Sequence, residues 1–403
     1  MKVLYLTYDG LSDPLGQSQI LPYLIACHGH DHDISIISFE KKEAYIKNGE
    51  EIQSLLKQKG IQWTALRYTK SPPVFSTIKD LFQLTKISRE IIRERQIDVI
   101  HCRSYVTAFS AFVLKKELSI KVLFDIRGFW IDERVEGGLW NLNNPIYWSI
   151  YKFLKNKEHQ WFNQADAVVC LTNKAKSYIQ NKFRLVTPNN ITVIPCCTDT
   201  TLFDPLKVQK THHRTLKEEL GIKDGEKVLG YVGSLGTWYM YHEMLQSFKQ
   251  LLENGIAQKF LVITRDDSSD FKNKMTEYGI QPSDVIIVSA SREEVPHYMS
   301  QMDLGIFYIR PTFSKMASSP TKLGEYLSMG IPIITNSGVG DLDDFFRTNH
   351  VGMCVDILTQ DLNLTEVKSL LNLNSNEIRE SALNNLSLRS GIESYLKVYS
   401  DLS

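Results

Sequence analysis

The sequence lacks the features that mark several classes of protein. In its 403 residues, 46 Lys and Arg balance 46 Asp and Glu, and this zero net charge excludes a general nucleic-acid binder. No apolar run approaches the roughly 18 residues of a membrane span, and the apolar start at 2–7 is too short for a signal peptide. With 43% apolar and 23% charged residues, the chain is typical of a globular protein. At about 150 residues per domain, its length predicts two to three domains.

Cysteine is also scarce. The six cysteines, at 27, 102, 170, 196, 197 and 354, show no metal-ligand spacing. We interpret them as reduced thiols, which predicts a cytoplasmic protein without a metal site.

The zero net charge conceals two halves of opposite sign. Residues 1–200 hold 26 Lys and Arg against 20 Asp and Glu, whereas residues 201–403 hold 20 against 26. Because anionic lipid attracts basic surfaces, the basic half predicts peripheral contact with an inner membrane face. Segments 86–95 and 152–157 would lie on that surface, and simple solvated helices are the alternative.

Short β-rich segments alternate with longer amphipathic ones, as in parallel sheets with crossover helices. The expected strands are 2–7, 34–38, 62–67, 98–101, 121–125, 167–171 and 191–194, then 228–233, 260–264, 285–289, 304–309, 331–335 and 351–355. The clearest helical patterns cover 43–59, 77–96, 147–163 and 174–183. This order predicts an α/β protein of two Rossmann-like, doubly wound domains that face each other across a cleft.

A change in pattern at 195–217 predicts a linker between the two series. We therefore expect an N-terminal acceptor domain over 1–200 and a donor domain over 201–385. The terminal segment 386–403, with a helix over 391–402, could pack on either domain and is assigned to the first. Ligands of such sheets bind beyond the carboxyl ends of the strands, so the loops there are the candidate sites.

A glycine-containing loop follows the first strand of the second series. It contains Gly233, Ser234, Gly236 and Thr237. Glycine allows close approach of the backbone to a ligand, and free N–H groups at a helix start favour a phosphate. A capped turn is the alternative. Trp238 could stack on a base or fill the cleft.

The segment 318–332 combines helix signals with charged side chains. Ser319 is the expected N-cap, with Pro320 as first helical residue. Lys322 and Glu325 lie three residues apart, on one helical face, where they suit a phosphate and a sugar hydroxyl. A solvated ion pair is the alternative.

Four segments together match one known family. They are 9–18, 28–30, 193–203 with its Ile-Pro, Asp and Phe, and the donor-site pattern of Glu325, Gly330 and Pro332. On these segments the chain resembles bacterial glycosyltransferases of the GT-B type, close to the retaining family-4 group. The resemblance implies that Glu325 holds donor sugar or ribose hydroxyls, and that Asp13, Gly16 and Gln17 border the reacting centre.

The chain also departs from that family. It has Thr237–Met240 where the family usually has an Arg and a Lys, and Ala317 where it usually has a first glutamate. It has Phe124-Asp125-Ile126 near the place of a common histidine. The donor therefore need not be a common nucleotide sugar. Arg265, Arg310 and Lys322 are the cations expected to replace those lost.

An acidic segment at 125–138 follows the fifth strand and is expected to be a loop at the cleft. An inverting transfer needs a carboxylate base near the acceptor hydroxyl, which Asp125, Asp132 or Glu133 could supply. If the transfer retains the configuration of the anomeric carbon, the departing phosphate oxygen could take the proton instead. Arg127 and Arg134 could bind a phosphate in bidentate fashion. A solvated ion-pair loop is the alternative.

The predicted site therefore has three parts. The catalytic candidates are Asp125, Asp132, Glu133 and Asp13. The donor candidates are Gly233, Ser234, Gly236, Thr237, Arg265, Arg310, Ser318, Ser319, Thr321, Lys322 and Glu325. The acceptor candidates are Gly16, Gln17, Arg103, Arg127 and Arg134. No metal ligand is predicted.

The predicted function is transfer of a sugar from a diphosphate donor to a saccharide or lipid-linked glycan, in bacterial capsule or O-antigen synthesis. The first alternative is a phosphoribosyltransferase that uses 5-phosphoribosyl pyrophosphate with Mg²⁺, for which 264–269 is a faint motif. A nucleotide-sugar epimerase and a non-catalytic carbohydrate-binding scaffold are the others.

Overall fold

The computed structural model describes residues 1–30, 32–72, 74–183, 190–208, 210–357 and 361–403. The chain divides into two compact units, of which the first comprises Met1–Cys196 with Leu388–Ser403 and the second Cys197–Ser387. Within the described residues no helix is both long and apolar enough to cross a membrane.

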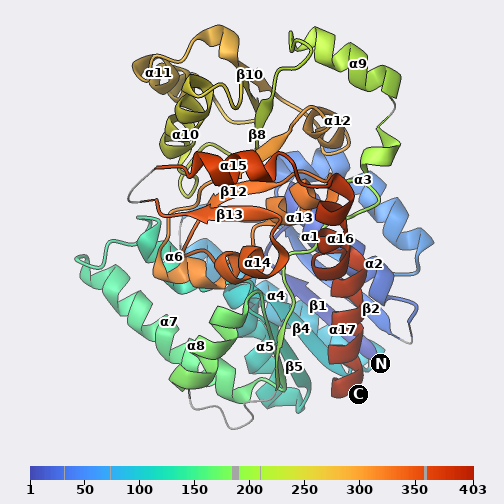
Figure 1. Cartoon of the computed structure of the whole chain (residues 1–403). Helices are drawn as coiled ribbons and strands as arrows, with labels where there is room; N and C mark the ends of the chain where they lie inside the picture. Colours follow the sequence, from blue (N-terminus) through green and yellow to red (C-terminus); the bar gives the residue numbers. More distant parts are fainter. Residues whose placement is uncertain (31, 73, 184–189, 209, 358–360) are drawn as a thin grey trace. The chain divides into compact units, whose positions relative to one another are not determined.

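The first unit is built on a parallel sheet of seven described strands in the order β3-β2-β1-β4-β5-β6-β7 (Figure 1). The strands are β1 Lys2–Thr7, β2 Asp33–Glu40, β3 Gln62–Arg67, β4 Val99–Arg103, β5 Lys121–Asp125, β6 Ala167–Cys170 and β7 Ile191–Val193. The central strands are almost continuously buried, because helices cover both faces of a parallel sheet.

The helices of this unit connect successive strands, except for the terminal helix α17, which follows the second unit in the chain. They are α1 Pro14–Gln19, α2 Leu21–Cys27, α3 Lys42–Gln58, α4 Phe75–Arg95, α5 Ser104–Leu118, α6 Trp130–Glu136, α7 Pro145–Gln164, α8 Asn173–Phe183 and α17 Leu388–Leu402. The start of α7 shows why helices form where they do: the Asn144 side chain caps the Ile146 N–H, and Pro145 is the first helical residue. The terminal helix α17 packs on α2, and Figure 1 shows the two side by side.

The second unit repeats the architecture with six described strands in the order β10-β9-β8-β11-β12-β13. They are β8 Val228–Val232, β9 Lys259–Ile263, β10 Val285–Val288, β11 Leu304–Phe307, β12 Ile333–Asn336 and β13 Gly352–Val355. The α-helices are α9 Lys210–Glu219, α10 Tyr241–Glu253, α11 Ser269–Glu277, α12 Val295–Met299, α13 Thr321–Ser328, α14 Leu342–Asn349, α15 Leu364–Leu370 and α16 Ser375–Asn385. Short 3-10 helices cover Pro205–Lys207, Pro282–Asp284 and Phe313–Ala317.

Both sheets confirm the predicted α/β class with two Rossmann-like domains, and every expected strand is present within a few residues. Three local predictions were wrong. The irregular character expected for 195–217 was wrong, because this segment contains the 3-10 helix Pro205–Lys207 and most of α9; its role as a linker stays a prediction, and residue 209 lies outside the described residues. The acidic segment is not all loop, because 130–136 form α6. The N-cap of α13 is Pro320, so Thr321 and not Pro320 is its first helical residue.

Candidate functional site

The strand order of each sheet reverses at one point, where doubly wound sheets usually hold their ligands. In the first unit the reversal lies between β1 and β4, and in the second between β8 and β11. The loops after these strands are therefore the first place to look for a site. In the second unit they are joined, since Tyr239 pairs with Ile309 in an isolated bridge and the Arg310 N–H donates to the Trp238 carbonyl at 2.9 Å.

Gly233 begins the loop after β8, in a backbone conformation that favours glycine, and it lies against the end of the Lys322 side chain. Its φ of +136° lies in a region that favours glycine. A Cβ at this position would also collide with the ammonium of Lys322 on α13. The backbone and a cation therefore meet at the carboxyl end of β8, as a phosphate site requires.

The Lys322 side chain is buried without an anionic partner. It is 6% exposed, and its Nζ lies 3.9 Å from the ring centroid of Tyr239 and 5.2 Å from that of Tyr231. Among the residues that the structure describes, no carboxylate forms a salt bridge with it and no acceptor hydrogen-bonds it. Aromatic faces offset only part of the cost of burying an ammonium, so this site is suited to an anionic ligand.

Glu325, one turn further along α13, is also under-satisfied. Its nearest cation is Arg292, with Nη1 3.8 Å from Oε1, and within the described part of the chain its carboxylate accepts no hydrogen bond. Burial raises the pKa of Glu325 above the ordinary carboxyl value, although Arg292 and Lys322 both lower it. A carboxylate with free acceptor capacity next to a cation can bind the hydroxyls of a ligand whose phosphate lies at that cation.

The other predicted donor residues surround this centre to different degrees. Ser234 accepts the Tyr231 hydroxyl through its carbonyl, and Thr237 has a φ of +52°. A Cβ on Gly236 would meet nothing, so close packing does not require that glycine. Ser318, Ser319 and Thr321 lie at the start of α13, half-buried.

Arg265 and Arg310 are exposed, and the Arg265 Nε donates to the Ala290 carbonyl at 2.9 Å. The two aspartates of the segment 264–269, which suggested a phosphoribosyl pyrophosphate site, bind backbone N–H groups. Asp266 accepts the Leu235 N–H at 2.8 Å, and Asp267 accepts the Ser269 N–H at 3.0 Å. These two carboxylates therefore organise loops, and the motif gives no support to a magnesium site.

Two further cationic side chains near this site, Lys315 and Arg292, could not be recognised from the sequence. Lys315 is 7% exposed and places its Nζ 3.8 Å from the ring centroid of Trp238. Arg292 pairs with Glu325 and also lies over the Phe203 ring. They follow β11 and β10, and only the fold brings them to the glycine loop and α13.

In the first unit, Asp125 is fully buried at the end of β5, at the centre of a polar network. The Tyr395 hydroxyl on α17 donates to its Oδ2 at 2.8 Å, and His101 Nε2 lies 3.5 Å away. Arg127 and Arg103 approach the same oxygen at 3.9 and 4.0 Å. Burial by itself would raise the pKa of Asp125, but Arg127, His101 and Arg103 outweigh it and lower the pKa to about 2.

This geometry gives the predicted acceptor arginines internal partners. Arg127 donates to Cys196 Sγ at 3.2 Å, and Arg103 pairs with Asp9 at 3.3 Å. An inaccessible carboxylate with so low a pKa is a weak base. The network thus fits a structural role that holds α17 to β4 and β5, rather than contact with an acceptor.

The acidic residues of α6 have partners as well. Asp132 accepts the Tyr151 hydroxyl and the Lys155 ammonium, both at 2.9 Å. Glu133 is half-buried in the same turn, and Arg134 lies over the Trp130 ring at 4.6 Å.

The loop after β1 is held by a carboxylate that sequence reasoning missed. Glu40, buried at the end of β2, accepts the Leu11 N–H at 2.7 Å and the Ser12 N–H at 3.0 Å. The signal for it in the sequence was a single carboxylate at the end of an apolar strand. It fixes the loop from which Gln17 Nε2 donates to the Ser12 carbonyl at 2.9 Å.

The predicted residues Asp13 and Gly16 lie at the start of α1. Asp13 pairs with Lys41 at 2.9 Å. A Cβ on Gly16 would overlap the Gly10 carbonyl and Leu11, so close packing explains this glycine without a ligand.

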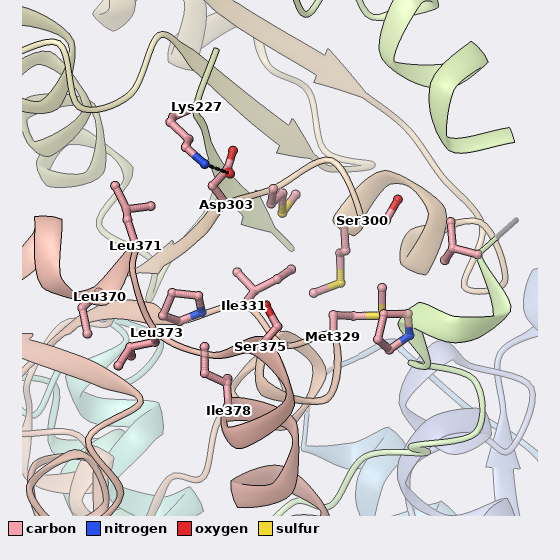
Figure 2. Close-up of a pocket in the computed structure, with 16 residues that line it drawn as sticks. Lys227, Ser300, Asp303, Met329, Ile331, Leu370, Leu371, Leu373, Ser375 and Ile378 are labelled. Atoms are coloured by element: carbon pink, nitrogen blue, oxygen red, sulfur yellow. Dashed lines mark hydrogen bonds and ion pairs between the residues drawn. The ribbon is translucent and has the colours of Figure 1, made fainter. Parts of the chain in front are cut away.

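The second unit has a cavity of about 560 Å³ away from these residues. Figure 2 shows it lined by Ile331, Leu370, Leu373 and Ile378, with the Lys227–Asp303 ion pair at 2.7 Å. Lys227 and Asp303 precede β8 and β11, so the cavity lies at the amino edge of the sheet, opposite Gly233. Across the described residues no group of three His, Cys, Asp or Glu could hold a metal ion.

Two family models match the chain in succession. The model described as Glycosyltransferase Family 4 matches residues 21–202, and Glycosyl transferases group 1 matches residues 213–385. A search of curated protein sequences finds no match.

Solved structures share the fold over the whole chain. A glycosyltransferase from Rickettsia africae is 16% identical with a TM-score of 0.70, covering 100% of this chain and 98% of its own. The sucrose-phosphate synthase of Thermosynechococcus elongatus is 12% identical with a TM-score of 0.71, covering 100% and 99%. Anabaena HepE in complex with UDP-glucose is 13% identical with a TM-score of 0.67, covering 99% of each chain. At these identities the likeness shows the fold alone.

Proposed function

Because this chain belongs to the family-4 glycosyltransferases of the GT-B fold, we propose that it transfers a sugar from a nucleotide-sugar donor to a saccharide or lipid-linked glycan. The observation that carries the proposal is the buried Lys322 ammonium, which meets Gly233 and lacks an anionic partner among the described residues. A donor diphosphate provides the missing negative charge.

In this proposal the diphosphate lies between the loop after β8 and the start of α13. Lys322 and the free N–H groups at the start of α13 stabilise the negative charge that grows on the leaving diphosphate. Glu325 accepts hydrogen bonds from donor hydroxyls. Four other predicted residues could also contact the phosphates, with less support than Lys322: Ser319, Thr321, Arg265 and Arg310.

The proton of the acceptor hydroxyl goes to the departing diphosphate. The acceptor oxygen forms a bond to the anomeric carbon, the bond from that carbon to the diphosphate oxygen breaks, and the released oxygen takes the proton. We favour this route because three of the four candidate bases are poorly suited to take the proton: Asp125 is buried with a pKa of about 2, Asp132 is paired with Lys155, and Asp13 with Lys41. Glu133 is the remaining candidate base. The route predicts a retaining transfer, which nuclear magnetic resonance of the product anomer tests.

A role in bacterial surface polysaccharide synthesis in the cytoplasm is the biological setting we propose. Six cysteines in 403 residues are too few for a disulfide-stabilised scaffold, which fits a reducing compartment. The acceptor site is assigned to residues 13–17 at the start of α1, directly after the loop whose Leu11 and Ser12 N–H groups Glu40 holds.

A thermal-shift screen tests the donor class. The full chain is mixed separately with nucleoside diphosphates, nucleotide sugars, and 5-phosphoribosyl pyrophosphate with Mg²⁺. Stabilisation by a nucleoside diphosphate and its sugar supports the proposal, whereas stabilisation by the phosphoribosyl compound alone contradicts it. Conversion of the nucleotide sugar without any acceptor would instead indicate an epimerase, and absence of every shift a scaffold.

A further inference from the structure

Helices α4, α5, α7 and α8 form one layer over the first sheet, in which α4 and α7 each expose three large apolar side chains and α5 exposes Val113. α4 packs on α5, α5 on α7, and α7 on α8 (Figure 1). The exposed apolar residues are Phe75, Ile78 and Phe82 on α4, and Ile146, Trp148 and Phe153 on α7. Together with the lysines Lys79, Lys86, Lys152 and Lys157 they are called the aromatic–basic surface below.

On α4 the exposed apolar residues form a stripe. Phe75, Ile78 and Phe82 follow the spacing of one helical face, and the two phenylalanines are 73% and 74% exposed. The opposite face already packs in the core through Leu84 and Ile92. Scattered exposed apolar residues are normal in soluble proteins, but an aromatic stripe that contributes nothing to the core points to a partner.

The same surface is basic. Lys79 and Lys86 are exposed on the α4 stripe, while on α7 the Lys152 Nζ lies 5.7 Å from the Trp148 ring centroid and the Lys157 Nζ 5.7 Å from that of Phe153. Each helix of the layer has more Lys and Arg than Asp and Glu. Asp80 and Glu158 are buried, and the exposed Glu90, Glu94 and Glu117 are outnumbered by the Lys and Arg of the same helices, so the surface stays basic. Long cationic side chains beside aromatic rings are typical of helices that lie in a membrane interface.

The apolar residues lie at the same edge of the sheet as the predicted acceptor loop. Helices that connect parallel strands run back across the sheet, so their first turns lie at its carboxyl edge. Phe75, Ile78 and Phe82 occupy the first turns of α4, and Ile146 and Trp148 the first turn of α7. The loop after β1, with Asp13, leaves the sheet at the same edge.

We propose that the aromatic–basic surface docks on an anionic lipid bilayer, with the aromatic rings in the interface and the lysines at the headgroups. A second copy of the chain is disfavoured as occupant, because two basic surfaces repel each other. The biological role of this docking rests on the proposed function, since it would bring a lipid-linked acceptor to the loop after β1. The docking itself needs neither donor nor acceptor.

Co-sedimentation of the full chain with vesicles tests the docking. Vesicles of equal phosphatidylglycerol and phosphatidylcholine are compared with pure phosphatidylcholine, at low and high salt. We expect binding to the anionic vesicles only, weakened by salt, and about a tenfold loss of partitioning in the double variant Phe75→Ser/Phe82→Ser. Lys79→Glu is expected to cost about fivefold or more, since each basic residue near the surface contributes roughly 1 kcal/mol.

The matched control is Ile46→Ser on α3, because Ile46 is 73% exposed but lies outside the layer. Its partitioning should equal that of the unchanged chain, and thermal unfolding verifies that each variant is folded. Absence of binding to anionic vesicles, or equal binding by the double variant, overturns the proposal. So does light scattering that shows a dimer which the double variant loses. Donor binding in solution is measured separately, so failure of the docking leaves the donor result intact.

Discussion

Both units bury charged side chains near the carboxyl ends of their strands, but they treat these charges differently. In the first unit, Asp125 is surrounded by a tyrosine, a histidine and two arginines of the same unit. In the second, Lys322 is buried against two aromatic rings and a glycine. The difference teaches that burial and charge do not by themselves mark a ligand site. The informative feature is whether the folded chain already supplies the opposite charge.

Asp125→Asn should give the largest effect, because it removes the charge that compensates Arg127 and Arg103. Loss of one partner from a buried ion pair typically costs about 3–5 kcal/mol, and we expect a loss of stability in that range. Urea denaturation that follows the unfolding transition of the first unit measures this free energy. The exposed Glu50→Gln is the control. A loss below about 1 kcal/mol, as for a surface pair, would contradict the structural role of the network.

Lys322→Met should separate binding from stability. Donor diphosphate affinity is expected to fall about a hundredfold, because a charge-assisted contact in a buried site is lost. The melting temperature without ligand should stay equal or rise, because an unpaired buried ammonium is replaced by an apolar side chain. The exposed Lys272→Met is the control and should change neither quantity. A clear fall in melting temperature would mean that Lys322 has an internal structural role like that of Asp125.

Glu325→Gln should have a smaller effect. It keeps the shape of the side chain but weakens acceptance of a donor hydroxyl, so we expect about a tenfold rise in the KM for the donor. Steady-state kinetics across donor concentrations measures it. An unchanged KM would remove Glu325 from the donor site.

The two carboxylates should also titrate in opposite directions. Asp125 has a lowered pKa in the folded chain, so its contribution to stability is present above its unfolded pKa of about 3.9 and is lost as the pH falls towards 2. Glu325 has a raised pKa, so its contribution is present below its unfolded pKa of about 4.3 and is lost as the pH rises through the folded value.

Urea midpoints of both variants, measured from acid to neutral pH, test these signs. The deficit of Asp125→Asn should shrink in acid, whereas Glu325→Gln should gain on the unchanged chain as the pH rises. If the stabilities of the two variants relative to the unchanged chain varied with pH in the same direction, the opposite pKa shifts assigned to Asp125 and Glu325 would be contradicted.

Most of the fold could be predicted from the sequence, because buried parallel strands are short apolar segments separated by amphipathic helices. The failures were short or irregular elements. Helix α6 has only seven residues between Gly128 and Gly137, so its pattern is too brief to distinguish from a loop. The domain boundaries assigned from the sequence stay predictions; they are 1–200, 201–385 and 386–403. The structure divides into compact units after Cys196 and after Ser387.

The candidate site could be predicted only in part. Gly233, Lys322 and Glu325 were singled out by their place after a strand or on one helical face. The partners of each charge could not be predicted, because they come from distant parts of the chain: Tyr395 on α17 reaches Asp125. Glu40 was missed for the same reason, since its role depends on the loop after β1 folding over the end of β2.

Calorimetric titration of a panel of nucleoside diphosphates into the full chain, repeated with Lys322→Met, tests the central claim most directly. We predict that at least one nucleoside diphosphate binds the unchanged chain and the Lys272→Met control equally, and binds Lys322→Met about a hundredfold more weakly. Equal affinity for the unchanged chain and Lys322→Met would contradict the assignment of the buried ammonium to the donor diphosphate.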